Sequence, residues 1–125
     1  MFGLRATDSR YGPRRPDALP LLSLVTVRGP SMVPALRHGD RLLARRVRSA
    51  TQLRAGEVVL VSWADRPGRL AVKRVVGLVP GGHWVEGDNP YGSDDSRTYG
   101  PATVRAVVVV RCWPWPPRIS ATLRR

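Results

Sequence analysis

The amino-acid sequence predicts an all-β domain, a barrel or sandwich of short strands with little helix. About six or seven short apolar runs recur along the chain, with turn residues every eight to twelve positions or so. Glycine and proline each occur 12 times, which favours turns over long helices. The 125 residues fit one domain, and a hydrophobic content of 42% is enough to form a core.

Six segments carry the strand pattern. They are residues 21–28, 41–47, 58–63, 70–79, 83–86 and 103–113. Val58–Trp63 is apolar without interruption, which is typical of a strand buried on both faces. Ser31–Leu36 is expected to start a short helical turn, and Gly87–Gly100 is expected to form an ordered polar loop.

The chain is expected to divide into three parts. Residues 1–17 contain Arg, Pro and Gly without periodicity and predict a flexible basic arm. Residues 18–113 hold all the expected strands and form the domain. Residues 114–125 predict a Pro- and Arg-rich tail, because the prolines that follow Trp113 cannot continue a central strand.

The formal net charge is +12 and is distributed unevenly. Residues 28–54 carry seven arginines against one acid, residues 81–104 carry four acids against one arginine, and the chain from 105 onward has no acid. A basic surface suits nucleic acid, an anionic membrane or an acidic protein, and equally the solvated surface of an arginine-rich chain. Trp113 and Trp115 could stack on single-stranded nucleic acid or close over the core.

No segment approaches the roughly 20 apolar residues that cross a membrane, and the N-terminus lacks the pattern of a secretory signal. The longest apolar run, residues 18–27, is interrupted by Pro20 and Ser23. We therefore expect a cytoplasmic protein with peripheral membrane contact at most. Cys112 and two scattered histidines do not form a metal-ligand pattern, so neither a metal nor another cofactor is expected.

Lys73 is the only lysine among the 21 lysine and arginine residues. Arginine stays protonated in proteins, whereas a lysine among apolar groups can lose its proton and act as a base. Strand alternation places Lys73 in a row with Ala71 and Val75. Two roles remain open on the pattern alone, a buried base or a strand-edge ammonium that reaches water.

Ser31 lies in a short apolar turn between Pro30 and Pro34. Such a serine is commonly a turn residue, but a hydroxyl on a rigid corner beside a free backbone N–H also suits a nucleophile with an oxyanion site. Serine needs a base to take its proton, and a serine–lysine pair is one known solution. The spacing of His38 and His83 does not support a Ser-His-Asp triad, and we expect His38 to be a solvated turn residue and His83 a surface residue at a strand end.

Three segments together resemble the signal peptidase family of serine–lysine proteases, peptidase S26. The first is Gly29-Pro30-Ser31-Met32-Val33-Pro34-Ala35-Leu36 followed by Gly39-Asp40, the second is Lys73-Arg74-Val75-Val76-Gly77, and the third is Gly87-Asp88-Asn89 with Ser93-Asp94-Asp95-Ser96-Arg97 and Tyr99-Gly100. The resemblance covers roughly residues 24–110. It implies the family's fold, a signal peptidase-like (LexA-like) coiled β barrel, which agrees with the expected strands.

The resemblance also implies roles for residues in all three segments. Ser31 would be the nucleophile and Lys73 the general base. Ser93 would orient the Lys73 amine, and the pair formed by Asp95 and Arg97 would hold the last loop against the site. The lone lysine then has a reason, because an arginine at that position could not accept a proton.

The oxyanion hole and the substrate wall follow from the same resemblance. The Ser31 backbone N–H would supply one oxyanion donor. Some relatives supply a second donor from a serine two residues before the nucleophile, but that position is Gly29 here, which has no hydroxyl. Met32 and Pro34 would line the substrate site.

Within the family, the short chain and the Gly-Asp-Asn-Pro and Ser-Asp-Asp-Ser-Arg wording are similar to the nickel-type superoxide dismutase maturation proteases. The resemblance therefore implies a serine endopeptidase whose protein substrate is the propeptide-bearing form of nickel superoxide dismutase. The alternatives are a signal peptidase-type or self-cleaving LexA-like protease, and a non-enzymatic basic β-barrel that binds nucleic acid or an anionic surface. The acidic loop and the single lysine count against nucleic acid.

Overall fold

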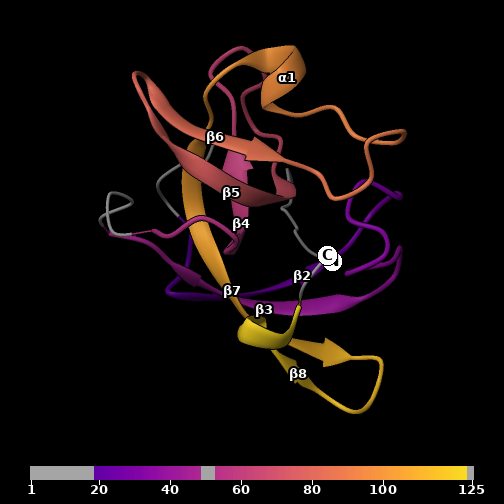
Figure 1. Ribbon diagram of the computed structural model, residues 1–125. Helices are drawn as coiled ribbons and strands as arrows, with labels where there is room; N and C mark the ends of the chain where they lie inside the picture. The colour runs from indigo at the N-terminus through magenta and orange to yellow at the C-terminus, as the bar shows by residue number, and fades with distance from the viewer. Residues whose placement is uncertain (1–18, 49–52, 124–125) are drawn as a thin grey trace.

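We describe residues 19–48 and 53–123 of a computed structural model, in which a seven-stranded antiparallel sheet forms the frame (Figure 1). The strands are β2 (Leu22–Thr26), β3 (Arg41–Arg46), β4 (Val58–Ser62), β5 (Ala71–Val79), β6 (Gly82–Glu86), β7 (Thr103–Trp113) and β8 (Arg118–Ile119). The described residues also form a four-residue helix, α1 (Ser96–Tyr99), and a 3-10 turn at Ser120–Thr122. The prediction of an all-β fold with little helix is confirmed.

β7 joins the two halves of the sheet. The strand order is β2-β3-β7-β4-β5-β6, with β8 also paired to β7. Along one edge β7 pairs with β3, and its other edge is shared by β4 and β8. Register shifts interrupt both long pairings, and such bulges bend a strand and increase its twist. β7 therefore runs between a layer of β2, β3 and β8 and a layer of β4, β5 and β6 (Figure 1).

The strand predictions agree with the structure to within one or two residues at each end. All of β4, Val58–Ser62, is buried, which confirms the interpretation of the continuous apolar run as a strand covered on both faces. The expected polar loop Gly87–Gly100 is mostly irregular, but it contains α1. Asp95 caps that short helix, since its side chain accepts the backbone N–H of Arg97.

The chain after Trp113 packs against the sheet as far as residue 123. A proline-rich turn follows β7, and Arg111 Nη2 donates to the carbonyls of Pro114 and Pro116 at 3.3 and 3.0 Å. β8 then pairs with β7, and Leu123 is buried in the core. Periodicity did not reveal this, because the prolines lie in the turn and the returning strand is only two residues long. The expected arm, residues 1–17, lies outside the described residues.

Side chains from several strands and turns form a core beneath the loop that connects β2 to β3. Its buried members are Val27, Met32, Leu36, Leu42, Val58, Val108 and Leu123. Met32 and Leu36 have no exposed surface, so they fix the turn that carries Ser31 to the sheet.

Leu36→Ala should lower the free energy of unfolding by about 2–5 kcal/mol, because it leaves a cavity in this core. The matched control is Leu78→Ala, which truncates a leucine exposed on β5 and should change stability by about 0.5 kcal/mol or less. Urea unfolding followed by circular dichroism measures both. Equal losses would show that Leu36 does not anchor the turn.

Candidate active site

Ser31 lies in a closed loop between β2 and β3. The loop is shut at its base because Val27 N–H donates to Asp40 O at 2.8 Å and Gly39 N–H donates to Val27 O at 2.9 Å. The expected helical turn contains one bond of α-helical spacing, from Leu36 N–H to Met32 O at 2.9 Å, and one tighter turn bond, from Val33 N–H to Pro30 O at 3.1 Å. Ser31 is half-buried above the core side chains, so its hydroxyl is carried on a firmly seated turn.

Gly29 and His38 brace the start of this turn. Gly29 has φ +80°, a left-handed conformation that favours glycine, and its N–H donates to His38 Nδ1 at 2.8 Å. Pro30 has no N–H, and no described residue accepts the N–H of Ser31. Of these three residues, only Ser31 therefore has a backbone donor left for an oxyanion. Sequence reasoning took His38 for a solvated turn residue; it is exposed, but it is also a partner of the turn.

Lys73 is buried on β5, opposite Val59 of β4, with only 4% of its surface exposed. Burial lowers the pKa of the Lys73 amine from its ordinary value of 10.5, although the nearby carboxylates of Asp95 and Asp94 act in the opposite direction. Its Nζ donates to Ser93 Oγ at 3.2 Å. The Lys73 amine is therefore buried and is not a strand-edge ammonium that reaches water.

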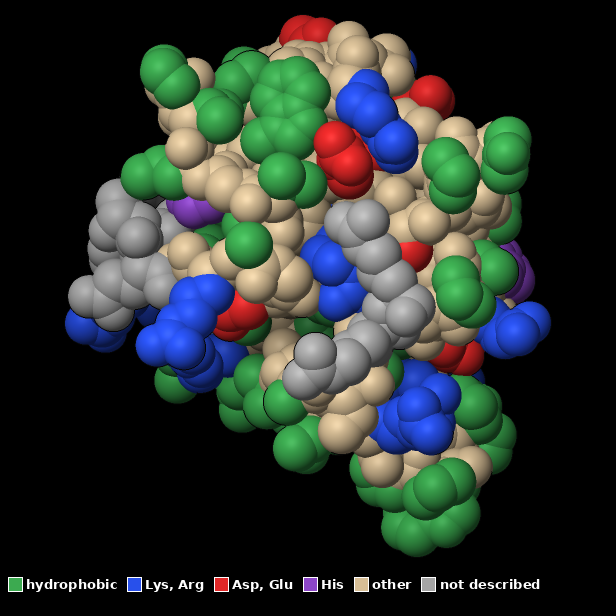
Figure 2. Space-filling model, in the orientation of Figure 1, with side chains coloured by type: hydrophobic (Ala, Val, Ile, Leu, Met, Phe, Trp, Pro, Cys, Tyr) green, Lys and Arg blue, Asp and Glu red, His purple; other side chains and the backbone are tan. Residues whose placement is uncertain are grey.

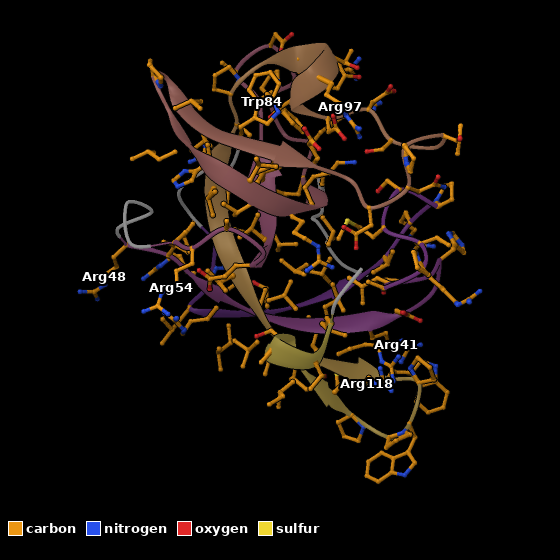
Figure 3. All side chains as sticks on the ribbon, viewed as in Figure 1. Arg41, Arg48, Arg54, Trp84, Arg97 and Arg118 are labelled. Atoms are coloured by element: carbon orange, nitrogen blue, oxygen red, sulfur yellow. The ribbon has the colours of Figure 1, made fainter. Side chains whose placement is uncertain are left out.

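Ser93 is held in turn by the buried carboxylate of Asp95. Ser93 Oγ donates to Asp95 Oδ2 at 2.7 Å, so the serine proton points to Asp95 and a lone pair of Oγ faces Lys73. Arg97 donates to the same carboxylate through Nε at 3.0 Å and Nη2 at 2.6 Å. Figure 3 shows the Arg97 side chain beneath α1, near Trp84 of β6.

The environment of Asp95 keeps it ionised. Its side chain has no exposed surface, and burial by itself raises the pKa of a carboxyl group. The hydrogen bonds from Arg97, the Gly87 N–H and Ser93 outweigh burial and hold the pKa of Asp95 well below its usual range. The hydroxyl of Ser93 thus lies between the ionised carboxylate of Asp95 and the amine of Lys73.

Gly87 and Asn89 connect the lysine side of the site to the turn of Ser31. Asn89 N–H donates to Ser31 O at 2.9 Å, and Asn89 Nδ2 donates to Pro30 O at 3.2 Å. A Cβ at Gly87 would lie 2.6 Å from Ser31 O and would overlap Ser93 Oγ. Gly87 is therefore the point where the two sides of the site meet. Within the described residues, no hydrogen bond joins Ser31 Oγ to Lys73 Nζ, and such contacts are often long before substrate binds.

A buried ion pair fixes the residues next to Lys73 and Gly87. Arg74 donates to Asp88 through Nε at 2.8 Å and Nη2 at 2.7 Å, and its Nη1 donates to Gly56 O at 2.8 Å. Neither side chain is appreciably exposed. Sequence reasoning included both residues in the family segments but gave them no role. The available signal was an arginine adjacent to Lys73 and an acid within the third family segment.

The two residues predicted to line the substrate site, Met32 and Pro34, lie apart from this network. Met32 is in the core, so its side chain anchors the turn and has no exposed surface that could contact a substrate. Pro34 is exposed. His83, expected at the surface, is buried because its strand end pairs with Ala102.

In the part of the chain that the structure describes, no three His, Cys, Asp or Glu side chains are grouped as a metal site would need. No helix there is long and apolar enough to span a bilayer.

Comparison with known proteins identifies the family. The family model described as signal peptidase, peptidase S26, matches residues 18–83. The chain belongs to this family. Membership implies a peptidase, which hydrolyses peptide bonds in a protein substrate.

Curated relatives match most of the chain. Subunit 1 of the mitochondrial inner membrane protease of Xenopus tropicalis is 35% identical over 90% of this chain and 83% of its own length. The mitochondrial ATP-independent inner membrane protease subunit 1a of Arabidopsis thaliana is 34% identical, over 83% of this chain and 77% of its own length. Subunit 1 from Schizosaccharomyces pombe is 33% identical over 76% of each.

These relatives correct one expectation. The sequence was interpreted as that of a cytoplasmic protein, because no apolar run long enough to cross a membrane was found. That prediction is wrong, since the relatives are named as proteases of a membrane. The absence of a long apolar run is a weak guide to location for a small catalytic domain.

Gly87→Ala should disrupt the site, because the added methyl group would collide with Ser31 O and Ser93 Oγ. The matched control is Gly77→Ala on β5, where a Cβ meets no atom within 4 Å and φ is not positive. We expect Gly87→Ala to lose at least about 1–3 kcal/mol of stability, and Gly77→Ala to lose much less. Thermal unfolding gives the comparison, and tolerance of both substitutions would contradict the close approach.

The pKa of Lys73 can be measured directly, because protein labelled with ¹³C at lysine Cε gives one lysine signal. Its titration midpoint should lie below 10.5. Asp94→Asn should lower the midpoint further, because the Asp94 carboxylate raises the pKa of Lys73. Glu57→Gln, outside this network, is the control. A midpoint at or above 10.5 would show that burial does not control this amine.

Proposed function

We propose that the protein is a serine endopeptidase in which Ser31 attacks the substrate and Lys73 takes the proton of its hydroxyl. The observation that supports this proposal is the state of Lys73. The chain's only lysine is buried, its pKa is lowered by that burial, and its amine is positioned by Ser93. A neutral amine has the lone pair that a general base needs, and an arginine at this position would stay protonated.

In the proposed reaction, Ser31 Oγ attacks the carbonyl carbon of the scissile bond while its proton moves to Lys73 Nζ. The Ser31 N–H donates to the oxyanion of the tetrahedral intermediate. Lys73 then gives the proton to the departing amine, which leaves an acyl-enzyme. Water, deprotonated by Lys73, hydrolyses that ester and restores Ser31. Ser93 is a positioning residue, since it fixes the direction of the lysine amine.

Gly29 is proposed to support the turn of Ser31 and not to take part in the oxyanion hole. Its N–H is already used by His38, and it has no hydroxyl. It therefore supports the turn and does not supply the second oxyanion donor. Asp95 and Arg97 support the site through Ser93.

The proposed substrate is a precursor protein with an N-terminal extension, and the specific proposal is the precursor of nickel-type superoxide dismutase. The support for it is the wording of the loop that follows Gly87, which resembles the maturation proteases of that enzyme. The named relatives favour a second candidate substrate, a precursor protein that is processed at a membrane.

Purified protein should release the N-terminal extension from nickel superoxide dismutase precursor, as followed by mass spectrometry. Ser31→Ala and Lys73→Arg should each reduce the rate by at least about 100-fold, and cleavage by the wild type should increase with pH through the lowered pKa of Lys73. Arg69→Lys, at an exposed arginine, is the control and should retain the rate.

Two outcomes separate the parts of this proposal. Normal cleavage by Lys73→Arg would contradict the lysine base. Cleavage of a membrane-processed precursor, with the nickel superoxide dismutase precursor left intact, would keep the peptidase mechanism and transfer the substrate to the second candidate.

A further inference from the structure

One side chain connects the two arms of the loop that carries Ser31. This loop, residues 27–40, leaves β2 and returns to β3, and backbone hydrogen bonds close its base. Above the base, the Gly29 N–H donates to His38 Nδ1 at 2.8 Å, across nine positions of the chain. His38 on the returning arm is therefore bonded to the residue that lies two positions before the proposed nucleophile.

The peptide between Pro30 and Ser31 carries the Ser31 N–H, so its orientation decides where that donor points. Its carbonyl oxygen accepts two hydrogen bonds, of 3.1 and 3.2 Å, at the long end of the usual range. Just before this peptide, Gly29 has φ +80°, and no atom lies within 4 Å of the position where a Cβ would be. Glycine adopts either sign of φ readily. The hydrogen bond from His38 therefore holds a residue that side-chain packing does not hold.

This hydrogen bond exists only while the imidazole of His38 is neutral. Nδ1 accepts the Gly29 N–H, so Nδ1 has a lone pair and the ring proton is on Nε2. A protonated imidazole has an N–H at both nitrogens and no acceptor, so it cannot bind the Gly29 N–H. The side chain is exposed, so water can deliver that proton directly. Histidine is the side chain that ordinarily changes its charge between about pH 5 and 8.

The charged side chains of the loop, apart from His38, are Arg28, Arg37 and Asp40. Both arginines are exposed, whereas the Asp40 carboxylate is buried and accepts the Arg37 N–H at 2.9 Å. The segment that packs on the turn from the far side of the site brings Asp88, which is paired with Arg74. Figure 2 shows a histidine at the right-hand edge of the molecule, where Figure 1 draws the β2–β3 loop, with an arginine or lysine beside it.

We propose that His38 is a positioning residue for the oxyanion donor, and that it acts only as a neutral imidazole. In that state it holds Gly29 and, through Gly29, the peptide that presents the Ser31 N–H. Protonation breaks the hydrogen bond, frees the glycine and lets the N–H turn away from the oxyanion. His38 does not touch the reacting atoms. Its effect on rate rests on the proposed function, but the bond itself can be measured without substrate.

Two protonations would then slow cleavage as the pH falls, that of Lys73 and that of His38. His38→Asn separates them, because asparagine Oδ1 takes the place of histidine Nδ1 and accepts a hydrogen bond, but does not titrate. Both enzymes keep Lys73, so its contribution cancels in the ratio of the wild-type rate to the His38→Asn rate. That ratio reports the protonation of His38.

The kinetic test uses the nickel superoxide dismutase precursor, or the membrane-processed precursor if that is the one cleaved. At about pH 8, His38→Ala should lower kcat by about 2- to 10-fold with little change in KM, because the oxyanion forms only after the substrate binds. His38→Asn should recover most of that loss. Between about pH 8 and pH 5, the ratio of the wild-type rate to the His38→Asn rate should fall by a similar factor. Arg37→Lys, at an exposed neighbour, is the control and should keep the wild-type profile.

A second measurement needs no substrate. In protein labelled with ¹⁵N at glycine and serine, the Gly29 amide proton should shift upfield as the His38 ring gains its proton, and the Ser31 amide signal should move with it. Both signals should stay fixed over the same range in His38→Asn.

Three results would overturn the proposal: amide signals that stay fixed in the wild type, a rate ratio that does not change with pH, or a His38→Asn variant as slow as His38→Ala. If the wild type cleaves no precursor, the proposed function fails, and the amide signals alone decide whether His38 holds the turn.

Discussion

The buried carboxylate of Asp95 is the interaction on which the site depends. It accepts hydrogen bonds from the Gly87 N–H, Ser93 Oγ and the backbone and side chain of Arg97, and it caps α1. A fully buried charge is stable only when it is satisfied in this way. Because its donors come from the end of β6 and from α1, the carboxylate fixes both segments at once. The direction of Ser93, and through it of the Lys73 amine, follows from that arrangement.

The same packing arrangement buries the Lys73 amine and supplies the hydrogen bonds that the Asp95 carboxylate needs. The sheet covers the lysine and lowers its pKa, whereas the nearby carboxylates limit how far the pKa falls. The folded protein consequently binds fewer protons at Lys73 than the unfolded chain between the lowered pKa and 10.5. Stability should therefore rise with pH over that window, and the destabilisation caused by charging the buried amine is complete below it.

Much of the fold could be predicted because strand periodicity is a local property. The continuous apolar run Val58–Trp63 gave a central strand, and the eleven residues Thr103–Trp113 gave β7 with the correct ends. The return of residues 118–123 was not predicted, because a two-residue strand has no period and its position is set by Arg111 and the turn carbonyls. The partner role of His38 was missed for a similar reason, since its bond to Gly29 depends on how the loop closes.

The sequence by itself determined which residues are available for chemistry: a single lysine on an apolar strand, a serine in a rigid turn and a polar loop that holds the acids. These are local choices of residue type. The tertiary structure decided which of them meet and which state they adopt. The close approach at Gly87 and the hydrogen bonds of Asn89 join the loop to the turn of Ser31. The burial of β5 lowers the pKa of Lys73, because desolvation depends on every segment packed around the amine.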